Sequence, residues 1–123
     1  NGYKSFTGQT LMKESFNTDF DILTKSYGGL DMNTLTLLAP AQELEEEYRF
    51  AVINGKVVSG AMYMDDKNRG FWKAHWDKPC EDNLATAFAD IMAEIYQPDR
   101  AYTLDVCKLK KGGYKLIEIN SFF

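Results

Sequence analysis

The sequence predicts an α+β fold in which a mainly antiparallel sheet carries a helix on one face. Two hairpin signals support the sheet: Asn54-Gly55 and the glycine pair Gly112-Gly113 each separate two β-rich runs. A third observation is the helical spacing of the apolar residues in 81–96. The predicted strands lie near residues 47–54, 56–64, 101–109 and 114–120.

Size and composition limit the class of protein. The chain has 123 residues, of which 45% are apolar, and its net charge is −4. This length suits one domain with a single core. The acidic balance argues against nucleic acid as a partner, because binders of the phosphate backbone normally carry a basic patch. No run of apolar residues is long enough to span a membrane and no signal peptide is visible, so we expect no membrane partner. Cys80 and Cys107 lack metal-ligand spacing, which predicts reduced thiols and a cytoplasmic location.

The last hairpin places three oxygen-bearing side chains on one face of the sheet. Asp105 lies opposite Glu118 if the loop is 110–113 or its two central residues, and opposite Asn120 if Gly112-Gly113 alone forms the turn. All three side chains share a face in every one of these registers, because successive residues of a strand alternate. Facing carboxylates repel, and a bound cation relieves the repulsion. Such oxygens suit Mg²⁺; the alternative is a solvated face with scattered charges.

The pattern of Asp105 followed by Glu118-Ile119-Asn120 resembles the ATP-grasp superfamily. A second match is the run from Glu47 to Val58, which looks like the strand pair after the adenine hinge of that family. The resemblance implies Mg²⁺ and ATP as cofactors, with Asp105, Glu118 and Asn120 as metal ligands. It also implies an ATP-dependent ligase that activates an unidentified carboxylate as an acylphosphate, which an amine or a thiol then attacks.

Glu47 and Arg49 are the expected ribose and phosphate ligands. The Asn54-Gly55 turn predicts that Arg49 pairs with Gly60 and Glu47 with Met62. An acid and a cation beside a glycine leave a charged space, which suits a ribose-binding Glu47 and a catalytic, phosphate-binding Arg49. The alternative is an exposed ion pair of little energetic value. The same register assigns to the opposite, apolar face Tyr48, Phe50, Val52, Val57, Ala61 and Tyr63.

By resemblance, residues 1–38 belong to a lid subdomain and 39–123 to the core sheet with the metal site. Family members place a lid lysine on the phosphates, and Lys4 is the candidate here, with Lys13 as a rival and a solvated surface lysine as the alternative. We expect the segment to be part of a longer ligase, because relatives of this kind are usually longer.

The hinge that reads adenine with its backbone is assigned, also by resemblance, to Leu38 and Ala39. They end a predicted buried strand, 35–38; an ordinary strand exit at Pro40 is the alternative. A further strand is expected within 9–16.

Two helices are expected. The first begins at a cap within Asn17-Thr18-Asp19 and stops at Gly28-Gly29. The second, 81–96, ends before Pro98, and its alanines add helix propensity. Its predicted core stripe consists of Leu84, Phe88, Ile91, Met92 and Ile95.

One departure from the family pattern concerns the basic residue that many members carry two positions before the metal aspartate. Thr103 occupies that position, and Arg100 is predicted to lie on the opposite face. Arg49 is therefore the better candidate for the triphosphate cation. Two other functions stay open: a non-catalytic nucleotide-binding or structural module, and a metal-dependent phosphoesterase, which the near absence of histidine disfavours.

Overall fold

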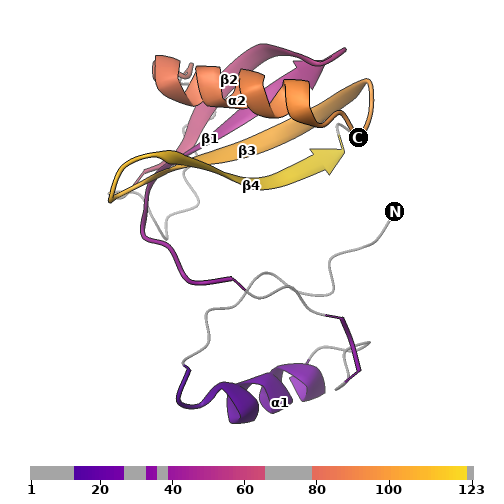
Figure 1. Cartoon of the computed structure of the whole chain (residues 1–123), viewed down its shortest axis with the longest axis vertical. Helices are drawn as coiled ribbons and strands as arrows, with labels where there is room; N and C mark the ends of the chain where they lie inside the picture. The colour runs from indigo at the N-terminus through magenta and orange to yellow at the C-terminus, as the bar shows by residue number, and fades with distance from the viewer. Residues whose placement is uncertain (1–12, 27–32, 36–38, 66–78, 122–123) are drawn as a thin grey trace. The chain divides into compact units, whose positions relative to one another are not determined.

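The computed structural model describes residues 13–26, 33–35, 39–65 and 79–121. The chain divides into two compact units, Asn1–Ala41 and Gln42–Phe123. The first contains α1 (Phe16–Ser26). Neither described helix is both long and apolar enough to cross a membrane. The second unit contains β1 (Leu44–Ile53), β2 (Lys56–Asp65), α2 (Asn83–Ile95), β3 (Ala101–Leu109) and β4 (Tyr114–Ser121), as Figure 1 shows.

Helix α1 begins earlier than the sequence suggests. Residues 13–15 form a turn and Phe16 opens the helix, so the strand expected within 9–16 is wrong at that end; residues 9–12 lie outside the described part. The predicted cap residues 17–19 lie inside the first turn. The N–H of Asp19 donates to the carbonyl of Ser15 at 2.9 Å, and the Ser15 hydroxyl donates to the Asp19 carboxylate at 2.5 Å. Leu35, expected in a buried strand, is 99% exposed and lies in no strand.

The second unit is a four-stranded antiparallel sheet in the order β2-β1-β3-β4. Both predicted hairpins are present, and α2 covers one face, which confirms the α+β fold class (Figure 1). Asn54 and Gly55 have φ of +50° and +75°, the left-handed backbone that a two-residue hairpin turn between right-twisted strands requires. The sheet therefore rests on turns that the sequence encodes locally.

Two β-bulges in β2 change the predicted pairing with β1. Val58 and Tyr63 are extra residues on β2, so Arg49 faces Ala61 and Glu47 faces Met64. The predicted pairs, Arg49 with Gly60 and Glu47 with Met62, are therefore wrong. Each extra residue shifts the following side chains to the other face of the sheet. Met62 consequently packs against the core, whereas Ala61 and Tyr63 leave the apolar face predicted for them.

Gly60 lies opposite Phe50 on the core face of the sheet. A Cβ atom at Gly60 would stand 2.4 Å from two atoms of the Phe50 ring. The glycine therefore lets the aromatic ring lie against the neighbouring strand, and only the bulged register brings the two residues together.

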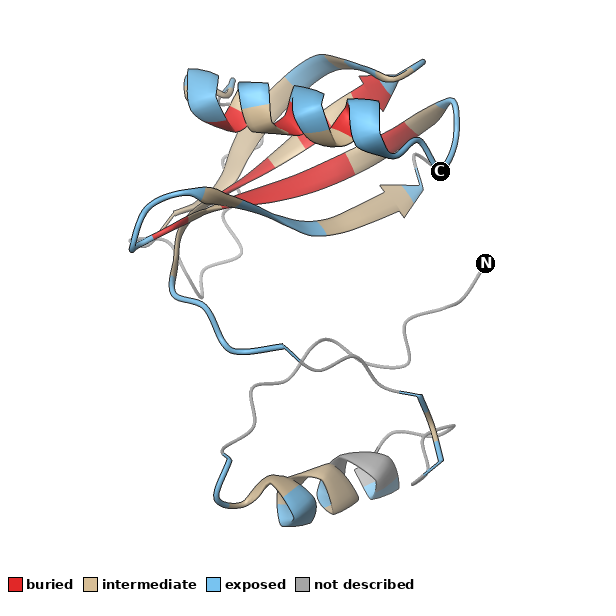
Figure 2. Ribbon diagram, in the orientation of Figure 1, coloured by how far each residue is buried: buried red, intermediate tan, exposed pale blue. Residues whose placement is uncertain are grey.

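The core between the sheet and α2 is closed by alanine side chains. Ala85, Ala89 and Ala93 are fully buried. Figure 2 shows the buried stripe of the helix facing the buried central strands. The predicted stripe is only half right: Phe88 and Met92 pack against the core. Leu84, Ile91 and Ile95 are 68%, 52% and 71% exposed, because the helix approaches the sheet through its smallest side chains. The strand residues of this core are Tyr48, Phe50, Val52, Tyr102, Leu104 and Val106.

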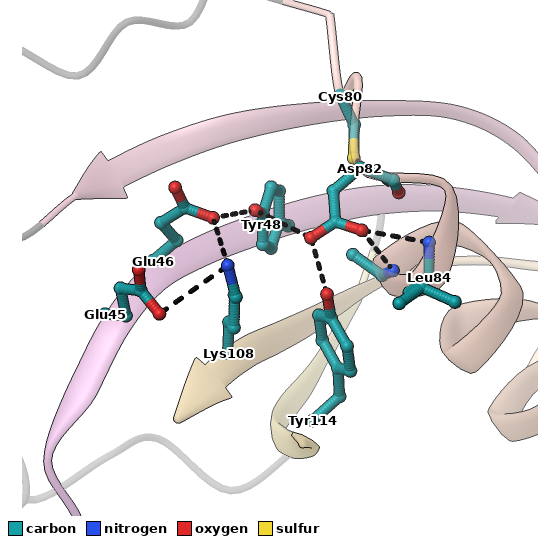
Figure 3. Close-up of polar contacts among 9 residues, drawn as sticks. Glu45, Glu46, Tyr48, Cys80, Asp82, Leu84, Lys108 and Tyr114 are labelled. Atoms are coloured by element: carbon teal, nitrogen blue, oxygen red, sulfur yellow. Dashed lines mark hydrogen bonds and ion pairs between the residues drawn. The ribbon is translucent and has the colours of Figure 1, made fainter. Parts of the chain in front are cut away.

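Asp82 joins the start of α2 to two strands. Its Oδ1 accepts hydrogen bonds from the N–H groups of Leu84 at 2.9 Å and Ala85 at 3.1 Å, which makes it the N-cap. Its Oδ2 accepts from the Tyr114 hydroxyl at 2.6 Å and lies 3.3 Å from the Tyr48 hydroxyl, which also contacts Glu46 (Figure 3). One carboxylate thus ties the helix to β1 and β4.

We expect Asp82→Ala to lower the free energy of unfolding by about 1 kcal/mol near neutral pH. Burial raises the pKa of Asp82, but the hydrogen bonds from Tyr114, Ala85 and Leu84 outweigh it, so the net pKa lies below its ordinary value. A lowered folded pKa means that the contribution is present above about pH 4 and is lost as the pH falls through that pKa.

Urea denaturation at about pH 7 and about pH 3 measures this, and the difference from the wild type should shrink at the lower pH. Asp90→Ala, at an exposed position of the same helix, is the matched control. A pH-independent difference would contradict the assignment of Asp82 as a charged cap.

We expect Gly60→Ala to destabilise the fold by about 2 kcal/mol, because the added methyl group would overlap the Phe50 ring. Thermal or urea unfolding measures the loss. The neighbouring exposed Ser59 supplies the control, since Ser59→Ala should change the stability by about 0.5 kcal/mol or less. Equal stabilities of the two variants would show that the bulged pairing of Gly60 with Phe50 is wrong.

Candidate functional site

The face of the sheet opposite α2 carries a row of charged residues across three strands. Arg49 of β1 is paired with Asp105 of β3, and Asp105 is paired with Glu118 of β4. These residues alternate with the core residues of the same strands, so they point away from α2. The register between β3 and β4 is the one predicted for a 110–113 loop at this point. Closer to the turn it differs by one residue, because Ile117 is a bulge in β4.

Arg49 and Asp105 form a two-pronged ion pair at the centre of the row. Arg49 Nε donates to Asp105 Oδ1 at 2.8 Å, and a terminal nitrogen donates to Oδ2 at 2.7 Å. The Asp105 side chain is 1% exposed and the Arg49 side chain 34% exposed. Hydrogen bonding to Asp105 is the largest influence on Arg49 and raises the pKa of the guanidinium, which stays fully charged. A parallel pair of charge-assisted hydrogen bonds is among the strongest polar contacts in proteins.

Glu118 and Asn120 extend the charged row on β4. Both are partly buried, and Asn120 Nδ2 donates to Glu118 Oε1 at 3.0 Å. The structure therefore brings Asp105, Glu118 and Asn120 together on one face, as the alternation of residues predicts. Among the residues that the structure describes, no cluster of three His, Cys, Asp or Glu side chains could hold a metal ion. A metal here would draw on two carboxylates and one amide oxygen, a hard donor set that suits Mg²⁺ with water or phosphate oxygens completing its shell.

Glu47 lies two residues before Arg49 on the same face and is 9% exposed. The Tyr63 hydroxyl donates to Glu47 Oε2 at 2.8 Å. The Arg49 guanidinium carbon lies 5.4 Å from the centre of the Tyr63 ring, within the range of a cation–π contact. Burial, followed by the bond to Glu47, raises the pKa of Tyr63 well above its ordinary value, so the phenol stays a neutral donor.

Tyr63 is the one residue of this group that the sequence reading missed. A regular hairpin assigns it to the apolar face, and the bulges of β2 reverse that assignment. The available signal was Gly60: a glycine opposite the large Phe50 ring is a better pairing than a glycine opposite Arg49.

The remaining predicted ligands lie away from this group or outside the described residues. Lys4 and Leu38 fall outside them, and Ala39 is exposed in an irregular segment. Lys13, the rival lysine, is also exposed. Arg100 is exposed and contacts Asn54 Oδ1 at 3.5 Å, at the end of the sheet.

Neither cysteine forms a disulfide. Cys107 pairs with Glu47 across β3 and β1, and burial raises the pKa of its thiol.

Comparison with known proteins gives one match. A family model of the ATP-grasp domain, the second family of its clade, matches residues 1–123. No curated protein and no solved structure matches the chain. The match spans the predicted strand pairs and every residue of the charged row, so it agrees with the resemblance seen in the sequence.

We expect Arg49→Met to lower the free energy of unfolding by about 3 kcal/mol, because the Asp105 carboxylate would stay buried without its cation. Adding Asp105→Asn to this variant should restore part of the loss, since it removes the buried charge. Urea denaturation of the single and double variants measures both effects.

Arg100→Met is the matched control, because Arg100 is exposed and should contribute about 0.5 kcal/mol or less. If Arg49→Met and Arg100→Met were equally stable, the ion pair would make no net contribution to folding.

Proposed function

Because the chain belongs to a family of ATP-grasp domains, which are ATP-binding domains of the ligase type, we propose that its polar sheet face binds Mg²⁺-ATP. We further propose that it serves a ligase which joins a carboxylate to an amine or a thiol through an acylphosphate. The observation that carries the proposal is the row of Arg49, Asp105 and Glu118 across β1, β3 and β4.

Asp105, Glu118 and Asn120 would hold the metal. Their oxygens are hard donors on one face of two paired strands, and the observed pairing supports their joint use. When bound, Mg²⁺ supplies charge neutralisation to the phosphate oxygens. The chain's own contribution is to hold two carboxylates side by side against their mutual repulsion, which the Arg49 contact with Asp105 offsets.

Arg49 is the proposed catalytic cation. It lies in the same row as the metal ligands, its side chain is partly exposed, and its charge is permanent. A guanidinium in this place can donate to phosphate oxygens beside the metal. Phosphoryl transfer depends on such positioning and charge neutralisation, and it requires no protein nucleophile.

Glu47 is the proposed ribose ligand, because its carboxylate can accept hydrogen bonds from two hydroxyls and lies on the same face as Arg49. Family resemblance supports three further contacts within this proposal. Lys4, in a lid made of residues 1–38, would contact phosphate. Leu38 and Ala39 would present their backbone to adenine.

We expect Glu118→Gln to abolish the Mg²⁺-dependent part of ATP binding and all ATP-dependent product formation in the full-length protein. Removal of one negative charge weakens the metal site. The fold should be as stable as the wild type or more so, because the substitution has the same shape and relieves repulsion from Asp105. Calorimetry with ATP, with and without Mg²⁺, and thermal unfolding measure the two effects.

Glu45→Gln is the control, because Glu45 contacts Lys108 at 3.5 Å and belongs to no part of the proposed site. It should leave ATP affinity unchanged. Undiminished Mg²⁺-dependent binding in Glu118→Gln would refute the metal assignment, and a wild type that does not bind ATP would refute the proposed function.

A further inference from the structure

We propose that Tyr63 is a positioning residue of the nucleotide site, which orients the Glu47 carboxylate toward the ribose hydroxyls and supports the Arg49 guanidinium with its ring. This inference rests on the proposed function. It adds a residue that neither the sequence pattern nor the family resemblance assigned to the site.

The first argument is the backbone geometry that brings Tyr63 to this face. Tyr63 is the extra residue of the second bulge in β2, between Met62, which faces Tyr48, and Met64, which faces Glu47. Bulges redirect single side chains and are frequent beside active sites. Here the bulge directs an aromatic side chain toward Glu47 and Arg49, while Met62 next to it still packs into the core.

The second argument is that one side chain contacts both proposed nucleotide ligands. The hydroxyl donates to Glu47 Oε2 at 2.8 Å, and the ring centre lies 5.4 Å from the Arg49 guanidinium carbon. The hydrogen bond uses one of the roughly four acceptor positions of a carboxylate. It holds the carboxylate in one orientation before the nucleotide arrives, so less side-chain freedom is lost on binding.

The two contacts of Tyr63 can be separated by mutation. Tyr63→Phe removes the hydrogen bond to Glu47 and keeps the ring beside Arg49. Tyr63→Leu removes both contacts. Because Glu47 would act on the ribose, the hydroxyl of Tyr63 should matter only for nucleotides that carry ribose hydroxyls.

The test compares ATP with 2′,3′-dideoxy-ATP, both with Mg²⁺, by calorimetry on the full-length protein. We expect Tyr63→Phe to weaken ATP about fivefold and to leave the affinity for dideoxy-ATP unchanged. Tyr63→Leu should weaken both nucleotides, since Arg49 also loses its support. A general loss of folding would affect both nucleotides equally, so dependence on the hydroxyls separates positioning from stability.

Tyr114→Phe is the matched control. It too removes a phenol that donates to a carboxylate, that of Asp82 at 2.6 Å, but on the helix side of the sheet. We expect it to lower stability and to leave the ratio of ATP to dideoxy-ATP affinity at the wild-type value.

A Glu47→Gln variant keeps the two proposals distinguishable. If the wild type binds neither nucleotide, the proposed function itself fails. If Glu47→Gln loses the preference for ATP while Tyr63→Phe keeps it, only the positioning role of Tyr63 is overturned. Equal weakening of both nucleotides in Tyr63→Phe would also overturn that role.

Discussion

The ion pair between Arg49 and Asp105 is the interaction on which the polar face depends. A carboxylate that is 1% exposed has lost its hydration, and only a cation with two hydrogen bonds offsets that cost. The pair joins β1 and β3 at the centre of the sheet and places a permanent positive charge beside Glu118. Arg49 therefore serves the fold and is available to the site.

The two faces of the sheet are built in different ways. Toward α2, the core is closed by Ala85, Ala89 and Ala93, which let the helix backbone approach the strands closely. On the other face, polar contacts hold the side chains. Tyr48 and Glu47 are neighbours in β1, yet the first contacts Asp82 at the start of α2 and the second accepts from Tyr63 on the polar face. The register of β1 is thereby fixed from both sides.

The bulges of β2 explain the principal errors in the sequence-based prediction of the site. Pairing outward from the Asn54-Gly55 turn is correct for its first two pairs and fails at Val58, after which every side chain moves to the other face. A bulge leaves one residue unpaired, a loss that packing must offset. Here the stacking of Phe50 over Gly60 and the contact of Tyr63 with Glu47 depend on it. Neither contact is visible to a rule that reads turns and alternation.

Local signals in the sequence were enough to predict the strands, the two hairpins, the helix over 83–95 and the shared face of Asp105, Glu118 and Asn120. These features follow from turn chemistry and from residue periodicity, which act between near neighbours in the chain. Three-dimensional packing was needed to establish that Asp105 takes Arg49 as its partner, that Tyr63 joins the polar face, and that alanines form the buried stripe of α2. These outcomes depend on how side chains from distant segments fill the same space, and packing of that kind has no local pattern.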